Sequence, residues 1–190
     1  MLPVMPLPPW RPLLKAAQQR DSRSQAARWL QLATVSEDGT PRVRTLVFRG
    51  WSADDQLLLF TDARTEKARD LTHQPSVEVC WLLAKAKQQF RFRGVISTTN
   101  PAMDAQLCQH HWTTMRDSGR ALWAWPDPGA ELDLDASFPS ELSEHSAPPD
   151  HFLVLTLKVS AVENLDLSHH PHRRRLWLLV DQWRERRLNP

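Results

Sequence analysis

Arginine, lysine and threonine residues are concentrated between residues 40 and 67, in two stretches that each have the pattern of a β-strand end. The cationic members are Arg44, Arg49, Arg64 and Lys67, and the hydroxyl donors are Thr45, Thr61 and Thr65. Guanidinium and ammonium groups beside hydroxyl groups make the charge-assisted hydrogen bonds that hold a phosphate dianion. These stretches therefore predict a site for a phosphorylated ligand, although arginines on a strand can also serve only to solvate an exposed face.

The pattern of apolar residues predicts that β-strands carry most of these side chains. Strands are expected over residues 32–36, 42–49, 56–61, 77–83, 88–98, 152–162 and 175–180. The Asp38-Gly39 pair predicts a hairpin turn between the first two, because this dipeptide tolerates positive φ at both central positions. Residues 88–98 alternate in polarity, which places Phe90 and Phe92 in the core and the arginines on the opposite face.

Helices are expected at three places around these strands. The first covers about residues 9–32, interrupted by a polar stretch; the others cover about 65–72 and 100–117. Residues 126–150, rich in proline and acidic residues, are expected to form a long loop. These expected strands and helices together favour one mainly β domain over residues 1–190. Its antiparallel strands would form a closed or split β-barrel with flanking helices.

Composition narrows the functional class. The net charge of +2, from 24 basic and 22 acidic residues, argues against a nucleic-acid partner. The arginines of residues 173–187, with Trp177 and Trp183 as stacking platforms, keep a nucleic-acid module as an alternative. Cys80 and Cys108 lack CxxC spacing, which favours a reduced, cytoplasmic compartment. No run of about 18 apolar residues is present, so no membrane partner is expected.

Histidines offer a second alternative, a transition-metal site. The candidate ligands are His169, His170 and His172, with His110 and His111 elsewhere in the chain. No carboxylate or cysteine spacing supports such a site, and adjacent histidines on a loop rarely converge on one ion. We therefore expect no metal.

Four segments, in this order and spacing, give the chain a resemblance to the pyridoxamine 5'-phosphate oxidase-like flavoproteins. They are residues 39–49 (GTPRVRTLVFR), 60–67 (FTDARTEK), 89–94 (QFRFRG) and 183–190 (WRERRLNP). The chain looks closest to the branch of FMN-binding proteins related to the oxidase, rather than to the oxidase itself. The resemblance implies a Greek-key antiparallel split barrel that binds FMN, and a homodimer with FMN at the interface.

The same resemblance implies where FMN binds. Arg44 would lie beside the phosphate, Thr45, Leu46 and Val47 along the isoalloxazine ring, and Thr61, Thr65 and Lys67 in a second phosphate-binding segment. Arg49, Phe60 and Arg64 would complete this part of the cofactor site. Gln89 would contact the flavin, and Arg174 would stabilise the negative charge of the reduced ring, with Arg175 as the alternative. Arg174 and His172 are the expected catalytic residues.

The sequence departs from the family pattern near the substrate. Glu66 stands where the oxidases carry a second phosphate-binding arginine, so Arg64 is expected to supply that charge. Arg49, Arg116 and Ser118 fit the site for the substrate phosphate, but the chain has no tyrosine to complete it. We therefore expect an FMN-dependent oxidoreductase that oxidises an amine or alcohol with O₂ as acceptor. The alternative is an FMN-binding protein or flavin reductase without pyridoxamine phosphate oxidase activity.

Overall fold

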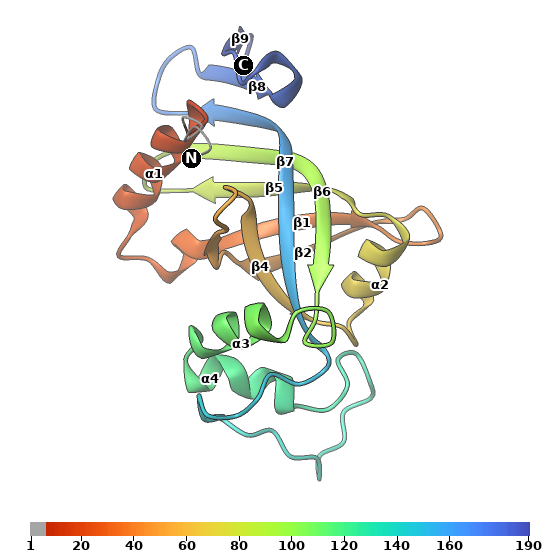
Figure 1. Cartoon of the computed structure of the whole chain (residues 1–190). Coiled ribbons are helices and arrows are strands. Elements are labelled where there is room, and N and C mark those ends of the chain that lie inside the picture. The colour runs from red at the N-terminus through yellow and green to blue at the C-terminus, as the bar shows by residue number, and fades with distance from the viewer. Residues whose placement is uncertain (1–6) are drawn as a thin grey trace, which may run out of the picture.

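The computed structural model describes residues 7–190 and is mainly β (Figure 1). The strands are β1 (Trp29–Val35), β2 (Pro41–Val47), β3 (Gly50–Trp51), β4 (Leu57–Asp62), β5 (Ser76–Leu83), β6 (Gln88–Thr99), β7 (Phe152–Asp166), β8 (Arg173–Leu178) and β9 (Arg186–Leu188). The α-helices are α1 (Trp10–Asp21), α2 (Glu66–His73), α3 (Ala105–Thr113) and α4 (Asp117–Arg120). Short 3-10 helices are η1 (Gln25–Arg28), η2 (Ala121–Ala124) and η3 (Leu179–Asp181).

All strand pairs are antiparallel, and the strands form one curled sheet in the order β2-β1-β5-β6-β7-β4-β3. A short branch extends from β7 through β8 to β9. Figure 1 shows α3, α4 and the long loop gathered at one end of the barrel, with β8 and β9 at the other. The mainly β barrel with flanking helices predicted from the sequence is therefore confirmed.

The sheet encloses a large apolar core and has a second, smaller one outside it. Trp10, Trp81, Phe90, Phe92 and Trp177 lie in the large core, each at most 1% exposed. The small core forms where the α3–η2 region packs on the outer side of β4, and its members are Leu58, Phe60, Cys108, Trp112, Met115, Trp123, Phe152 and Val154. All six residues of β4 are buried because its two faces contact different cores, as its continuous apolar run predicts.

The expected helix over residues 9–32 is wrong beyond residue 21. Helix α1 ends at Asp21, whose buried carboxylate accepts hydrogen bonds from the backbone N–H groups of Lys85 (3.1 Å) and Ala86 (3.0 Å). This contact anchors the helix end to the β5–β6 turn. The chain then turns through η1 and enters β1 at Trp29, three residues before the strand start expected from the sequence.

The expected helix over residues 100–117 starts later and ends earlier. Asn100 caps a turn instead, since its Oδ1 accepts from the Met103 N–H at 3.0 Å. Asp104 is the true N-cap of α3, and its Oδ1 accepts from the Leu107 N–H at 2.9 Å. The short strands β3 and β9 were not expected, and β7 continues four residues past the predicted end at residue 162.

Candidate functional site

Arg44 is held in place by partners on two other elements. Its Nη2 lies 2.9 Å from Oδ2 of Asp70 on α2, and its Nη1 donates to the hydroxyl of Thr34 on β1. Thr34 in turn donates to the same Asp70 oxygen at 2.7 Å. Burial by itself would raise the pKa of Asp70, but these hydrogen bonds and the charge of Arg44 hold it below its usual value. The guanidinium of Arg44 is therefore fixed before any ligand arrives.

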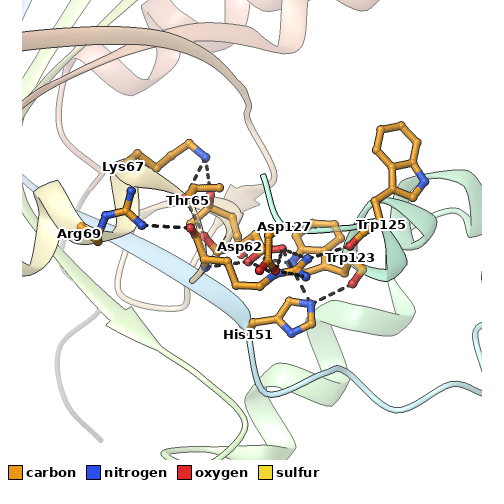
Figure 2. A network of polar contacts seen from close by, with 10 residues as sticks. Asp62, Thr65, Lys67, Arg69, Trp123, Trp125, Asp127 and His151 are labelled. Carbon is orange, nitrogen blue, oxygen red and sulfur yellow. Dashed lines mark hydrogen bonds and ion pairs between the residues drawn. The ribbon is translucent and has the colours of Figure 1, made fainter. Parts of the chain in front are cut away.

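Lys67 stands close to Arg44 at the start of α2. Its Nζ donates to the hydroxyls of Thr61 (2.8 Å) and Thr65 (3.3 Å), which Figure 2 shows in part. Burial lowers the pKa of Lys67, and the neighbouring charge of Arg44 lowers it further. Two crowded cations beside two hydroxyls and a helix N-terminus have the donor set that a phosphate group requires.

Arg64 turns away from Lys67. Its guanidinium forms a two-point contact with Asp62, with Nη2 2.7 Å from Oδ2, and it reaches Asp127 of the long loop at 3.0 Å. Its Nη2 also donates to the carbonyl of Trp125 at 3.2 Å. Figure 2 shows Asp127 and His151 on one side of Asp62, with Thr65 and Lys67 on the other. Arg64 therefore joins the phosphate segment to the long loop in this structure.

Gln89 and Arg174 occupy the same row of the sheet. Gln89 on β6 pairs with Leu165 on β7, and Leu165 pairs with Arg174 on β8. Directly paired residues of neighbouring strands point to the same face, whereas consecutive residues of one strand alternate. Arg175 therefore lies on the opposite face from this row, and Arg174 shares a face with Gln89.

Glu163 fixes the orientation of Arg174. The side chain of Glu163 is 9% exposed, and its two oxygens each lie 3.1 Å from a nitrogen of Arg174. Arg91 on β6 donates to Glu163 from the other side. Burial alone would raise the pKa of Glu163, but the hydrogen bonds and charges of Arg174 and Arg91 hold it below its usual value. Nothing in the sequence indicated that Glu163 would pair with these arginines, because Glu163 lies 72 residues from Arg91 along the chain.

Within residues 7–190, no hydrogen bond or ion pair joins the two parts of the expected flavin site. Arg44 on β2 and Arg174 on β8 are separated by the strands β1, β5, β6 and β7. The cluster of Arg44 and Lys67 and the row of Gln89 and Arg174 are thus distinct groups on the described chain.

The expected substrate residues are also spread. The guanidinium carbon of Arg49 lies 5.3 Å from the centre of the Phe60 ring, and His111 of α3 packs on that ring with centroids 5.3 Å apart. Arg116 and Ser118 are exposed at the start of α4, and among residues 7–190 neither forms a hydrogen bond or ion pair with Arg49. Sequence reasoning missed the contact between His111 and Phe60.

His172 lies in a cationic pocket near the C-terminus. A cavity of about 450 Å³ is lined by His172, Arg173, Arg174, Arg175, Arg187 and Leu188. The Nδ1 atom of His172 is 2.9 Å from the carbonyl oxygen of His169. Within the described residues, no three His, Cys, Asp or Glu side chains converge as metal ligands would. No helix in residues 7–190 has both the length and the apolar character to cross a membrane.

Comparison with known proteins identifies the family. The family model described as the FMN-binding domain of pyridoxamine 5'-phosphate oxidase matches residues 7–100. The pyridoxine/pyridoxamine 5'-phosphate oxidase 2 of Arabidopsis thaliana is 32% identical over 166 residues, 84% of each chain. The corresponding oxidase of Rhizobium etli is 31% identical over 93 residues, 49% of this chain and 43% of that protein. That match spans less than half of the bacterial relative.

Solved structures agree with this assignment. An FMN-binding protein related to pyridoxamine 5'-phosphate oxidase from Nostoc punctiforme aligns with a TM-score of 0.90 and 34% identity, covering 98% of this chain and 100% of that one. PhzG from Burkholderia lata aligns with a TM-score of 0.77 at 19% identity, covering 97% and 94%, and shares the fold. The chain belongs to the pyridoxamine 5'-phosphate oxidase-like family of FMN-binding split-barrel proteins. Its cofactor is FMN, as the resemblance implied.

Proposed function

We propose that this protein is an FMN-dependent oxidoreductase that oxidises an amine or alcohol and uses O₂ as the acceptor. The observation that carries the proposal is the pair of neighbouring cations, Arg44 and Lys67, beside the hydroxyls of Thr61 and Thr65. This group lies within the segment that matches the FMN-binding domain. When bound, FMN supplies the redox chemistry, because its ring accepts a hydride.

The phosphate of FMN fits the cluster of Arg44 and Lys67. Lys67 is desolvated and repelled by Arg44, so a dianion between them would relieve the repulsion. Asp70 keeps Arg44 oriented without occupying all of its donors. Arg64 pairs with Asp62 and with Asp127 of the long loop, and it would have to leave Asp127 to make its predicted phosphate contact.

The ring of FMN fits the edge of the sheet. Strand β2 pairs only with β1 among the described strands, so the backbone of Thr45, Leu46 and Val47 is available on its outer edge. Free amides and carbonyls of an edge strand can match the donors and acceptors of the flavin ring. Arg49 and Phe60 flank this region through their contact with each other.

A homodimer would complete the site. Gln89 and Arg174 share a face of the sheet but lie several strands from Arg44, so a second copy is the simplest way to bring Arg174 to the ring. Exposed apolar side chains support a covered surface, among them Trp29 (48%), Val43 (69%) and Leu82 (50%). We propose a cytoplasmic location as well, consistent with the two free cysteines.

Substrate would bind beside the flavin, with its anionic group toward Arg49 and with Arg116 and Ser118 as further contacts. His172 lies in the same pocket as Arg174 and would contact the substrate or accept a proton. Arg174, held by Glu163, would stabilise negative charge on the reduced ring.

The test begins with the visible absorption spectrum of purified protein before and after addition of FMN. Arg44→Ala and Lys67→Ala are each expected to weaken FMN affinity by about one to two powers of ten, the loss of one or two charge-assisted contacts. Lys85→Ala is the matched control, because Lys85 is exposed in the β5–β6 turn. Wild-type affinity in both site variants would overturn the phosphate assignment. Peroxide release from pyridoxamine 5'-phosphate under air would then test the oxidase reaction.

A second function is favoured by one feature of the composition. The chain contains no tyrosine, so one contact expected in the substrate site of the oxidases is missing. An FMN-binding protein or flavin reductase that does not oxidise pyridoxamine phosphate would keep the cofactor site and lack turnover. Bound flavin without peroxide release would support this alternative.

A further inference from the structure

Two segments at opposite ends of the molecule carry opposite charge. The long loop, residues 126–150, has no lysine or arginine, and its acidic residues are Asp127, Glu131, Asp133, Asp135, Glu141, Glu144 and Asp150. The arginine hairpin, residues 173–188, comprises β8, η3 and β9. It contains two acids, Asp181 and Glu185, and its arginines are Arg173, Arg174, Arg175, Arg184, Arg186 and Arg187. Figure 1 shows the long loop at one end of the barrel and the arginine hairpin at the other. No hydrogen bond or ion pair within residues 7–190 joins the two segments, so neither charge surplus neutralises the other.

Most carboxylates of the long loop have no cationic partner in the described chain. Asp127 pairs with Arg64, whereas the other acids of the loop are exposed and form no ion pair within residues 7–190. Leu132 and Leu134, on either side of Asp133, are 72% and 87% exposed. Exposed apolar side chains rimmed by charge are typical of a surface that contacts another protein. The long loop therefore offers a cationic partner both negative charge and apolar area.

The arginine hairpin offers the complementary surface. Arg175 and Arg187 stand directly opposite each other in the β8–β9 pairing. Like charges in that position repel each other, and anions from a partner would offset the repulsion. Arg184 is exposed and forms no ion pair within residues 7–190, and 89% of the Arg187 side chain is exposed although its Nε lies 3.2 Å from Glu185. Val180 of the same hairpin is 87% exposed and adds apolar area.

We infer that the long loop of one copy of this chain docks on the arginine hairpin of a second copy, with Leu132 and Leu134 against Val180. The inference rests on the proposed function, since it assigns surfaces through which the proposed homodimer forms. Because the two segments lie at opposite ends of the barrel, two copies packed antiparallel make this contact twice under two-fold symmetry. Oppositely charged surfaces also steer association and favour one orientation of the partner.

This arrangement completes the proposed site as well. Arg64 joins the long loop to the segment that carries Lys67, through its 3.0 Å contact with Asp127. An arginine hairpin docked on the loop therefore brings the partner's Arg174 to the side of the barrel that holds the cluster of Arg44 and Lys67. The contact that orients the second copy thus also supplies the cation for the flavin ring.

The experiment measures the dissociation constant of the dimer by fluorescence-detected sedimentation of the FMN-loaded protein at low ionic strength, where charge pairs act most strongly. The loop variant carries Glu131→Lys and Asp133→Lys, and the hairpin variant carries Arg184→Glu and Arg187→Glu. Each variant is expected to weaken self-association by about tenfold or more, because like charges then face each other. The variant with all four substitutions is expected to recover to within about threefold of wild type, since the pairing is restored with its charges exchanged.

Asp54→Lys and Arg20→Glu are the matched controls, because both residues are exposed and lie outside the two segments. Their dissociation constants are expected to stay within about twofold of wild type. If the loop variant has a lowered melting temperature, the neutral pair Glu131→Gln and Asp133→Asn replaces it, with an expected weakening of about threefold. No weakening in the neutral pair would contradict the inference.

A wild-type dissociation constant in the loop variant would overturn the inference and assign the long loop to a different basic partner or to solvent. The inference also fails if the variant with all four substitutions dimerises no better than the loop and hairpin variants, because the two surfaces then do not face each other. A dimer that is insensitive to every reversal would leave the proposed homodimer standing without this contact. Restored dimerisation without peroxide release from pyridoxamine 5'-phosphate would leave this inference standing while the oxidase proposal fails.

Discussion

Arg44 on β2 and Asp70 on α2 are joined by an ion pair with 2.9 Å between Nη2 and Oδ2. Asp70 is 6% exposed and also accepts a hydrogen bond from Thr34. Its carboxylate is therefore fixed by two neighbours and sets the direction of the guanidinium. A site for a dianion that relied on an unrestrained arginine would have to order that side chain on each binding event, at a cost in entropy.

Asp70→Asn is expected to weaken FMN binding by about three- to tenfold, because Arg44 keeps its charge but loses its orienting partner. Quenching of FMN fluorescence on titration with protein measures this affinity. Asp54→Asn, an exposed acid in the β3–β4 turn, serves as the control. Unchanged affinity in Asp70→Asn would show that Arg44 needs no fixed orientation to bind the phosphate.

Stability at low pH should depend on Asp70 as well. The pKa of Asp70 is lower in the folded protein than its ordinary value of 3.8. The stabilisation it provides is therefore complete above that ordinary value and is lost as the pH falls through the lowered pKa. Urea unfolding of the wild-type protein and Asp70→Asn should differ at neutral pH and converge in acid. Curves that stay equally far apart at all pH values would contradict this.

FMN affinity should fall with rising pH because of Lys67. Burial and the charge of Arg44 lower its pKa from the ordinary 10.5, so Lys67 loses its proton at a lower pH than a free lysine. Only the protonated ammonium attracts the phosphate, and affinity therefore declines as the pH rises through the lowered pKa. Lys67→Arg should remove this decline, since arginine stays protonated. If FMN affinity depended on pH in the same way in the wild-type protein and in Lys67→Arg, the assignment of Lys67 to the phosphate site would be wrong.

Replacing Glu163 should destabilise the sheet around Arg174. Glu163→Gln removes the negative charge between Arg91 and Arg174 and leaves two cations facing each other. The free energy of unfolding is expected to fall by about 1–3 kcal/mol. Urea unfolding provides the measurement. Glu78→Gln is the control, because Glu78 is more exposed and its carboxylate lies 3.6 Å from Arg91. This substitution should lower the free energy of unfolding by less than about 1 kcal/mol. A larger effect of Glu78→Gln would reverse this ranking.

Arg120 should hold the long loop more firmly than Arg64 does. Arg120 is 1% exposed, and its guanidinium donates to the carbonyls of Leu142, Trp112 and Met115 and pairs with Asp117. Residues 126–150 contain several acids and no lysine or arginine. A protease that cleaves after glutamate is therefore the suitable probe, since trypsin has no site there.

Arg120→Met is expected to speed cleavage of residues 126–150 at least about tenfold, because buried carbonyls lose their donor. Arg64→Ala should speed it less, since it frees only the start of the loop at Trp125 and Asp127. Equal cleavage rates in the two variants would show that Arg120 does not anchor the loop.

Local patterns predicted the parts of the fold that depend on neighbouring residues. A hairpin joins β1 to β2 as predicted, and Phe90 and Phe92 are fully buried on β6. Gly39 has positive φ but Asp38 does not, so the expected positive φ at both residues is wrong for Asp38. The Arg/Thr cluster was predicted from side-chain chemistry alone, and the structure brings Lys67 to its two threonines. These features need only the period of a strand and the chemistry of adjacent side chains.

Long-range contacts explain what local patterns could not predict. Helix α1 ends where the Asp21 carboxylate accepts a hydrogen bond from Lys85, 64 residues later in the chain. The residues near Asp21 give no indication of that partner. Arg64 likewise finds Asp127 63 residues away, and Glu163 finds Arg91. A hydrogen bond between distant strands depends on sheet order, which the sequence of one strand does not contain.

Strand β4 forms a wall common to both cores, with Leu57 and Leu59 in one and Leu58 and Phe60 in the other. If either core unfolded, one face of β4 would become exposed to solvent. The barrel and the α3–η2 region should therefore unfold as one cooperative unit rather than as two parts. Strand β4 also carries Thr61, whose carbonyl accepts a hydrogen bond from the Trp123 indole at 3.2 Å, so we expect motion of the α3–η2 region to reach the phosphate cluster.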